Sequence, residues 1–155
     1  GLIEQVGEGT KVYDNPATAF VASFVGENNA FQGTVSVVKT EKVIVSTGSG
    51  DLEASLGEDI KLSVGDKAIV FARPEAMSIV KRNNTIKNVL NSKVVYQEFE
   101  GNFWHLILDL KNGMKIKMSQ INDGSTQVYE EGSELKVQID PKLAVALPFG
   151  PLAAE

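Results

Sequence analysis

Apolar and polar residues alternate with a period of two along most of the chain after Phe31, which is the pattern of β-strands that bury one face. Turn residues such as Gly, Asn and Asp interrupt this alternation at short intervals, as expected of a sandwich or small barrel. The pattern predicts ten strands, at residues 31–39, 42–47, 51–56, 67–73, 76–80, 87–99, 103–111, 114–120, 134–140 and 143–147. We therefore expect a mainly β fold.

The N-terminal segment shows the one clear helical pattern of the chain. Asn15 followed by Pro16 is typical of a helix start, because Asn caps free backbone amides and Pro suits the first helical position. Phe20 and Phe24 are about one helical turn apart and give an apolar stripe. Gly26 stands where a left-handed residue commonly ends a helix, so we expect a short helix up to this point.

The strongest turn signal is Asn112-Gly113, because this pair readily adopts the positive φ angles of a two-residue hairpin turn. Trp104 begins an apolar alternation before the turn, and Met114 begins another after it. These alternations predict a hairpin with one buried face, on which Trp104 packs in the core. His105 falls on the opposite face, where we expect a surface residue and not a catalytic base.

The stretch 64–80 recurs near the C-terminus as residues 131–147, at a constant separation of 67 (132 − 65 = 67) and without gaps. The matched pairs are Gly65 with Gly132, Ala68 with Leu135, Val70 with Val137, Ala72 with Ile139 and Pro74 with Pro141. Each copy reads as a strand that starts after a Gly and ends at a Pro, followed by a short strand. We expect the two copies to bury their apolar faces against each other.

The two copies differ at the positions off the core face. The first copy has Ile69 and Phe71 where the second has Lys136 and Gln138. A strand that is apolar on both faces is usually covered on both. Either another part of this chain or a second subunit is therefore expected to lie over Ile69 and Phe71.

Composition limits the chemistry that the chain can perform. Its 155 residues suffice for a domain with a real core, and with no Cys and a single His it offers neither disulfides nor an obvious metal site. The net charge of −5 argues against nucleic acid as the main partner. Residues 7–11, GEGTK, contain glycines and a lysine but do not form a phosphate-binding loop. No nucleophile elbow is present, so we expect neither catalysis nor a cofactor in this chain.

One group of residues suggests a ligand site. The aromatic residues Tyr96, Phe99, Phe103 and Trp104 lie close in sequence to the acids Glu98 and Glu100, around the turn between two predicted strands. Aromatic faces together with carboxylates suit an organic cation through cation–π and ion-pair interactions. The alternative is a hairpin whose aromatic residues pack in the core and whose acids are solvated.

Residues 12–29, VYDNPATAFVASFVGENN, resemble the junction at which the nucleotide-binding domain of ABC importer ATPases ends and its C-terminal regulatory domain begins. The matching residues are Ile3, Gln5, Gly7, Val12, Tyr13, Pro16, Phe20, Val21, Ala22, Phe24, Gly26 and Asn29. The chain has Glu8-Gly9 where that family has Thr-Pro. Two further matches are Arg73-Pro74-Glu75, after a Gly-Asp turn and a strand, and Gly33-Thr34-Val35.

The resemblance implies an OB-fold-like β-barrel of the TOBE type over residues 30–150. Residues 1–29 would then be the end of the nucleotide-binding domain with its linker helix, and 151–155 a loose tail. The sequence of this junction is most similar to that of the polyamine and iron(III) branch of the importers. The motifs that bind ATP and Mg would lie upstream, so this chain should not hydrolyse ATP.

The resemblance also implies partners and a place in the cell. They are the chain's own upstream ATPase domain, a second copy of the subunit and the membrane permease subunits, on the cytoplasmic face of the membrane. As a regulatory and dimerisation module, the chain would use Phe20, Phe24, Ile69 and Phe71 at domain or subunit interfaces. The alternative is a solute-sensing domain that tunes the transporter's ATPase through Tyr96, Glu98, Phe99 and Trp104.

Overall fold

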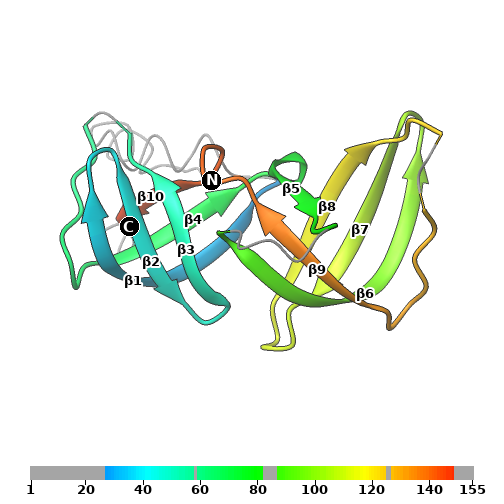
Figure 1. The fold of residues 1–155 in the computed structure, drawn as a ribbon, viewed down its shortest axis with the longest axis horizontal. Helices are drawn as coiled ribbons and strands as arrows, with labels where there is room; N and C mark the ends of the chain where they lie inside the picture. Colours follow the sequence, from blue (N-terminus) through cyan, green and yellow to red (C-terminus); the bar gives the residue numbers. More distant parts are fainter. Residues whose placement is uncertain (1–26, 58, 82–86, 125–126, 149–155) are drawn as a thin grey trace, which may run out of the picture.

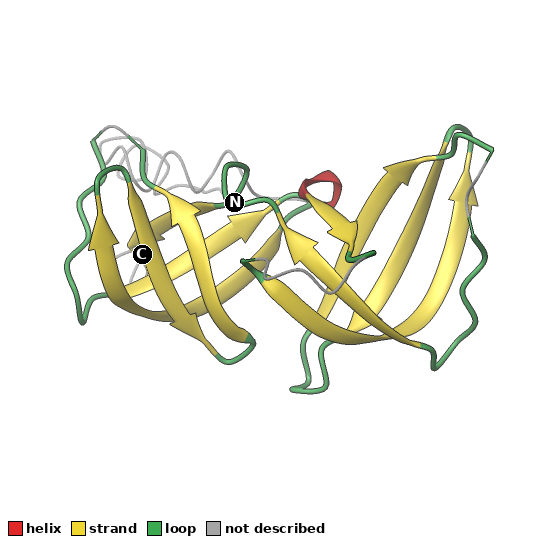
Figure 2. Ribbon diagram, in the orientation of Figure 1, coloured by secondary structure: helices red, strands yellow, loops and turns green. Residues whose placement is uncertain are grey.

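The computed structural model describes residues 27–57, 59–81, 87–124 and 127–148, which are almost entirely β-structure (Figures 1 and 2). The elements are β1 Asn29–Lys39, β2 Lys42–Thr47, β3 Gly50–Ser55, β4 Lys67–Ala72, the 3-10 turn η1 Pro74–Ala76, β5 Met77–Ile79, β6 Val89–Glu100, β7 Phe103–Asp109, β8 Lys115–Ile121, β9 Glu134–Ile139 and β10 Val145–Pro148. The predicted mainly β class and all ten predicted strands are confirmed. The predicted helix, with Phe20 and Phe24, and the tail after Pro148 lie outside the described residues.

The strands form two lobes that lie side by side (Figure 1). In the first lobe, β1, β2, β3, β10 and β4 close into a barrel in that order. In the second lobe, the five-stranded sheet has the order β5-β9-β6-β7-β8. The resemblance implied one OB-fold-like barrel over residues 30–150, and within it the strands form a closed barrel and a second sheet. A period of two assigns faces but does not say which strands share a sheet.

The two copies of the sequence repeat connect the lobes by exchanging their short strands. β10 pairs antiparallel with β4 in the first lobe, with Ala146 opposite Val70, and β5 pairs antiparallel with β9 in the second, with Ile79 opposite Val137. Each repeat therefore starts in one lobe and ends in the other (Figure 1). The expectation that the copies bury apolar faces together is confirmed, since Val70, Val137 and Ala146 are fully buried.

The duplication extends beyond the part that the sequence reveals. β1 has a bulge after Val35, and β6 has the corresponding bulge after Val94. The Gly65 amide donates to the Val35 carbonyl at 2.9 Å, and the Gly132 amide donates to the Val94 carbonyl at 2.7 Å. Both glycines have positive φ angles, of 96° and 88°, which they adopt without a Cβ clash. The lobes are therefore two versions of one unit, in which β1 to β4 correspond to β6 to β9.

The hairpin predicted at Asn112-Gly113 joins β7 to β8, but its loop is longer than predicted. The Leu110 amide donates to the Met114 carbonyl at 2.9 Å, so three residues lie between this pair. Lys111 and Gly113 have the positive φ angles, of 71° and 87°. The Asn112 carboxamide oxygen instead accepts from the Met114 amide at 3.0 Å. The two-residue turn was therefore wrong in length, because Asn112 stabilises the loop through its side chain.

Phe71 is only 8% exposed within the single chain, and Ile69 is half-buried. Both pair with β10, where Leu147 opposite Ile69 is fully buried. Phe71 is thus buried within the single chain, as its apolar character led us to expect, and no second subunit is needed to bury it. A role for Ile69 and Phe71 at a subunit interface stays a prediction.

A pair of asparagines joins each lobe to the third strand of the other. The Asn29 side chain, 6% exposed, donates to the Lys117 carbonyl at 3.0 Å and accepts from the Lys117 amide at 2.9 Å. The Asn88 side chain, 5% exposed, likewise donates to the Glu53 carbonyl at 2.8 Å and accepts from the Glu53 amide at 2.7 Å. In each case the side-chain carboxamide of the Asn makes the two hydrogen bonds that a neighbouring strand would make in a continuous sheet.

We predict that Asn29→Ala and Asn88→Ala will each lower the free energy of unfolding by about 1–3 kcal/mol. Asn88→Ala leaves a buried amide and carbonyl without partners, and Asn29→Ala a partly buried pair. Chemical denaturation followed by circular dichroism measures the effect. Gln32→Ala, at an exposed position of β1, is the matched control and should have little effect. Equal stability of Asn88→Ala and the control would show that the asparagines do not hold the lobes together.

Candidate functional site

The four residues suggested as ligand contacts lie on opposite faces of the second lobe. The bulge in β6 sets the register so that Tyr96 pairs with Ile107, Glu98 with His105 and Phe99 with Trp104. Directly paired residues share a face and successive residues alternate. Tyr96 and Glu98 therefore lie on the outer face, whereas Phe99 and Trp104 lie on the face toward the core. The structure does not bring the four together.

Trp104 is 7% exposed and belongs to the hydrophobic core, as predicted. His105, predicted to be a surface residue, is 8% exposed and that prediction was wrong. Its Nδ1 is 2.7 Å from the Ser119 hydroxyl and its Nε2 is 2.9 Å from a Glu100 carboxylate oxygen. The Phe103 ring stacks on it at 6.5 Å between centroids. The alternation gave the face of His105 correctly, but long neighbouring side chains cover the ring.

Next to His105 on the outer face, Lys117 forms an ion pair with Glu27 at 2.7 Å. The hydrogen bond from Lys117 lowers the pKa of the Glu27 carboxyl below its ordinary 4.5, and the same bond raises the pKa of Lys117 above its ordinary 10.5. The negative charges of Glu98 and Glu100 also raise the pKa of Lys117. Acidic groups thus surround one lysine on this face.

The corresponding place on the first lobe has one acid among lysines. The Glu53 side chain, 5% exposed, lies 3.1 Å from Lys87, 3.3 Å from Lys39 and 3.9 Å from Lys42. The hydrogen bond from Lys87 lowers the pKa of the Glu53 carboxyl below 4.5, against the opposing effect of burial. Glu53 is therefore a buried carboxylate that depends on its lysine partners for compensation.

The second lobe extends its first hairpin beyond the point where the first lobe stops. In the first lobe the ladder ends with Lys39 paired to Lys42. In the second, the corresponding pair of Glu98 and His105 is followed by Phe99 with Trp104 and by Glu100 with Phe103. The aromatic cluster is therefore an addition that only the second lobe carries.

A pocket of about 270 Å³ lies beside this extension, between β5 and β8, where the sheet of the second lobe is open. Its lining residues are Ser78, Ile79, Lys81, Trp104, Gln120, Ile121, Asp123, Gln127 and Tyr129. The Gln120 side chain donates to the Met77 carbonyl and so bridges the open edge. Gln97 holds the loop above, since its carboxamide oxygen accepts from the Tyr129 amide at 2.8 Å. An aromatic floor with one carboxylate can accept a small organic cation.

Comparison with known families identifies the repeat-bearing region. The family model described as "TOBE domain" matches residues 70–147, which run from β4 to β10. The chain belongs to the TOBE domain family. The match covers the second repeat, most of the first and the whole second lobe.

The relatives are ATP-binding proteins of spermidine/putrescine importers. The chain is 36% identical over 121 residues to the PotA protein of Fusobacterium nucleatum, covering 76% of this chain and 32% of that protein. It is 27% identical over 148 residues to the PotA protein of Rubrobacter xylanophilus, covering 95% and 38%. The chain thus spans about a third of the length of the curated relatives it matches.

The cytoplasmic molybdate-binding protein ModG, crystallised with molybdate bound, has a similar fold, with a TM-score of 0.69 and 18% identity. The match covers 80% of this chain and 99% of that chain. The OB-fold-like architecture expected of a TOBE domain is thus shown. Among the described residues, no helix is long and apolar enough to cross a membrane, and no group of three acidic or histidine side chains could hold a metal ion.

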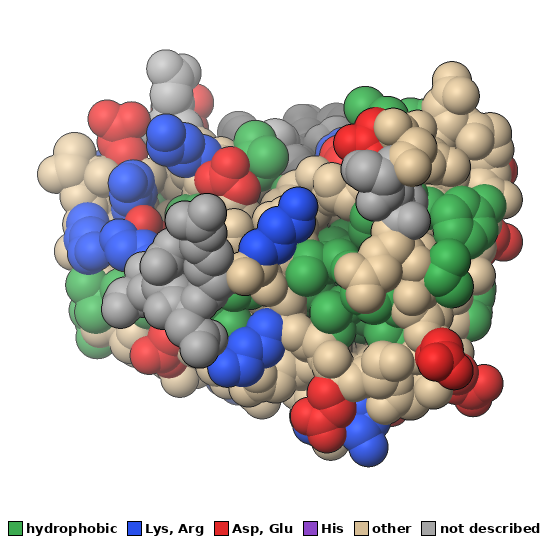
Figure 3. All heavy atoms as spheres, turned by 45° about the vertical axis from the view of Figure 1, so that its right-hand side comes forward, with side chains coloured by type: hydrophobic (Ala, Val, Ile, Leu, Met, Phe, Trp, Pro, Cys, Tyr) green, Lys and Arg blue, Asp and Glu red, His purple; other side chains and the backbone are tan. Residues whose placement is uncertain are grey.

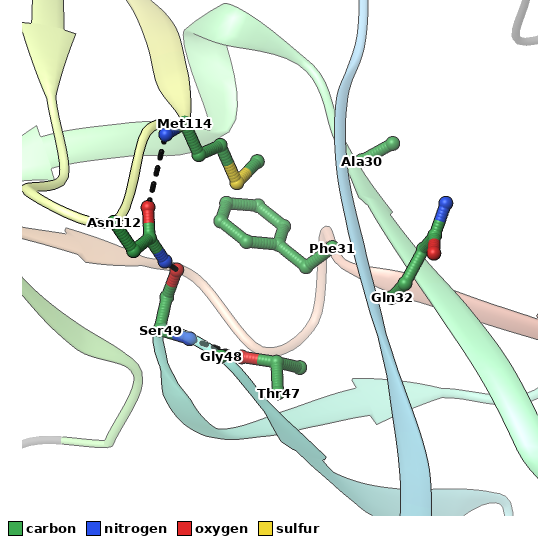
Figure 4. A pocket seen from close by; sticks show the side chains of 8 residues that line it. All are labelled: Ala30, Phe31, Gln32, Thr47, Gly48, Ser49, Asn112 and Met114. Carbon is green, nitrogen blue, oxygen red and sulfur yellow. Dashed lines mark hydrogen bonds between the residues drawn. The ribbon is translucent and has the colours of Figure 1, made fainter.

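A second pocket of this TOBE domain, of about 300 Å³, lies where the β2–β3 turn meets the β7–β8 turn (Figure 4). The Phe31 ring points toward Met114 in its floor. At its rim the Asn112 side chain donates to the Ser49 hydroxyl at 3.0 Å, and the Ser49 amide donates to the Thr47 hydroxyl at 3.0 Å. These polar groups satisfy one another's hydrogen bonds, so we interpret this pocket as a gap at the contact between the two lobes and not as a ligand site.

Sequence reasoning missed Asp123, Gln120 and Tyr129, which line the pocket beside Trp104. They come from β8 and the loop after it, and no sequence pattern links them to β7. It also missed Asn29 and Asn88. A usable signal existed, because each Asn stands two residues before the first fully buried residue of its long strand, Phe31 or Leu90.

We predict that the TOBE domain loses stability as the pH falls through the lowered pKa of Glu53. A carboxyl whose pKa is lower in the folded state contributes stability above its unfolded pKa of about 4.5 and loses it on protonation. Urea denaturation between about pH 6 and pH 3.5 should show a shallower loss for Lys87→Gln than for the wild type. The control Lys61→Gln, at an exposed loop position, should keep the wild-type slope. Parallel slopes for all three would contradict the prediction.

Proposed function

We propose that this chain is the C-terminal regulatory and dimerisation region of the ATP-binding subunit of a polyamine importer. The observation that carries the proposal is the match of the TOBE domain, together with most of the chain, to about a third of the length of spermidine/putrescine import ATP-binding proteins. ATP and Mg would bind in the preceding ATPase domain, and permease subunits would hold the complete protein at the cytoplasmic face of the membrane. The chain itself would be non-catalytic and would bind no nucleic acid.

The two-lobed architecture supports a role in holding partners at fixed positions. The lobes exchange strands and share buried side-chain contacts, which gives a body that transmits force between attached domains without bending at a linker. Five exposed hydrophobic residues lie on the second lobe, namely Tyr96, Phe99, Phe103, Ile121 and Val128. Figure 3 shows hydrophobic side chains gathered on this lobe where it comes forward. Such groups commonly mark interaction surfaces.

We expect light scattering over a concentration series to give the mass of a dimer. Replacing half-buried Ile69 by Asp should shift the equilibrium to the monomer if the outer face of β4 is at the interface. Val64→Asp, at an exposed loop position, is the matched control and should leave the mass unchanged. A monomer at every concentration would contradict dimerisation through this chain.

A second candidate function is solute sensing, which the pocket beside Trp104 favours. Trp104 and Tyr129 provide aromatic surface and Asp123 a carboxylate, in a space of about 270 Å³. A polyamine amino group would gain cation–π and ion-pair energy there. ModG, whose fold is similar, is a molybdate-binding protein, but an oxyanion would meet Asp123 in this pocket. A cationic solute is therefore the better match to its lining.

We predict that spermidine changes the fluorescence of Trp104, the one tryptophan of the chain, in a saturable manner. Asp123→Asn should weaken binding about tenfold by removing the carboxylate, and Lys81→Met should strengthen it by removing a competing positive charge. The opposite signs separate a specific effect from general perturbation of the pocket. No fluorescence change up to millimolar spermidine would rule out sensing at this site.

A further inference from the structure

The two contacts between the lobes carry ion pairs of opposite polarity. Near Asn29, the acidic residue Glu27 forms an ion pair with Lys117 of the other lobe at 2.7 Å. Next to Asn88, the basic residue Lys87 forms an ion pair with Glu53 of the other lobe at 3.1 Å. In each contact, the strand residue in the ion pair is also the residue whose backbone binds the Asn: Lys117 binds Asn29, and Glu53 binds Asn88. We refer to residues 27–29 as the acidic arm and 87–88 as the basic arm.

The residues that receive the arms occupy corresponding positions in the two lobes. Glu53 pairs across β2 with Ile44, which pairs with Val37 after the bulge of β1. Lys117 pairs across β7 with Ile107, which pairs with Tyr96 after the bulge of β6. Glu53 and Lys117 are thus the same position of the duplicated unit with opposite charge.

The inversion continues around these positions. Lys39 at the end of β1 corresponds to Glu98 in β6, since they pair with Lys42 and His105 respectively. Asp51, two residues before Glu53, corresponds to Lys115, two residues before Lys117. The charges of the two lobes are therefore reversed at these three positions, whereas Lys42 corresponds to His105, which is not an acid.

Hydrogen bonds alone do not tell one lobe from the other. Both arms carry an Asn, and both receiving strands offer a peptide amide and carbonyl, so either Asn can bind either strand. A second copy of the chain would offer the same groups. The charges are what distinguish the four possible combinations of arm and strand.

We propose that the inverted charges are a pairing code that makes unlike lobes bind each other and makes like lobes of two copies reject each other. The acidic arm on the first lobe of a second copy would put Glu27 beside Glu53 in place of Lys87, so that Lys39 and Lys42 would have to compensate two carboxylates. The basic arm on the second lobe of a second copy would place Lys87 beside Lys117. Because the Glu53 side chain is only 5% exposed, an added carboxylate there would be poorly screened by water.

The code is tested by exchanging the charges of the arms in the double variant Glu27→Lys/Lys87→Glu. Both contacts within the chain then become repulsive, whereas contacts between like lobes of two copies become attractive. The matched control is Glu27→Gln/Lys87→Gln, which removes the same charges without creating new ones. It keeps all other surfaces, so association through another face affects both variants equally, and failure of the dimerisation proposed above would not affect the comparison.

We expect the folding equilibrium constant of the exchanged variant to be at least about fivefold below that of the neutral control. The difference should shrink in 1 M NaCl, where the Debye length is about 3 Å. After refolding at high concentration, light scattering should show dimers of the exchanged variant beyond those of the control. Equal folding constants, or equal masses at every concentration, would overturn the proposal.

If the exchanged variant fails to fold, a double-mutant cycle at one contact decides the matter. Glu27→Lys and Lys117→Glu are measured singly and together by chemical denaturation. We expect the double variant to be more stable than the sum of the single effects predicts, because reversing both charges restores the attraction. Additive effects would show that the pair does not contribute to recognition between the lobes.

Discussion

The structure depends on two side-chain carboxamides that take the place of a neighbouring strand. At Glu53 in β3 and at Lys117 in β8, the peptide group facing the other lobe would be buried without a partner. A carboxamide offers a donor and an acceptor with the spacing of a peptide, so Asn88 and Asn29 satisfy both groups at once. Each asparagine thus completes an edge of the other lobe, and the exchanged strand β10 continues the edge of β3. We therefore expect the lobes to unfold together.

This mutual completion explains why local sequence patterns found every strand but not the arrangement of the strands. Alternation and turn residues are local, and they located the ten strands and the face of Trp104. Whether Val145 pairs with β9 of its own repeat or with β4 of the other repeat depends on contacts far apart in sequence. The single barrel that the resemblance implied and the observed two lobes have the same alternation, so the pattern cannot distinguish them.

The errors at single residues have a similar cause. His105 lies on the outer face that alternation assigned to it, yet Phe103, Glu100 and Ser119 cover it. Alternation reports the direction of a side chain and not the length of its neighbours. Tyr96 and Phe99 were grouped because they are close in sequence, but they are three residues apart on one continuous strand and so lie on opposite faces. Proximity in sequence is not proximity on a face of the sheet.

The differences between the duplicated lobes indicate where a specific function is most easily placed. The first lobe is closed, because β10 joins β3 to β4. The second lobe is open between β5 and β8, with Gln120 bridging the edge through its side chain. It also carries the two additional residue pairs that bring in Phe99, Phe103 and Trp104. The pocket and the aromatic extension are thus both found in the second lobe, whose sheet does not close into a barrel. Since both lobes share the same backbone plan, stability alone does not require this extension, and ligand or partner recognition accounts for it better.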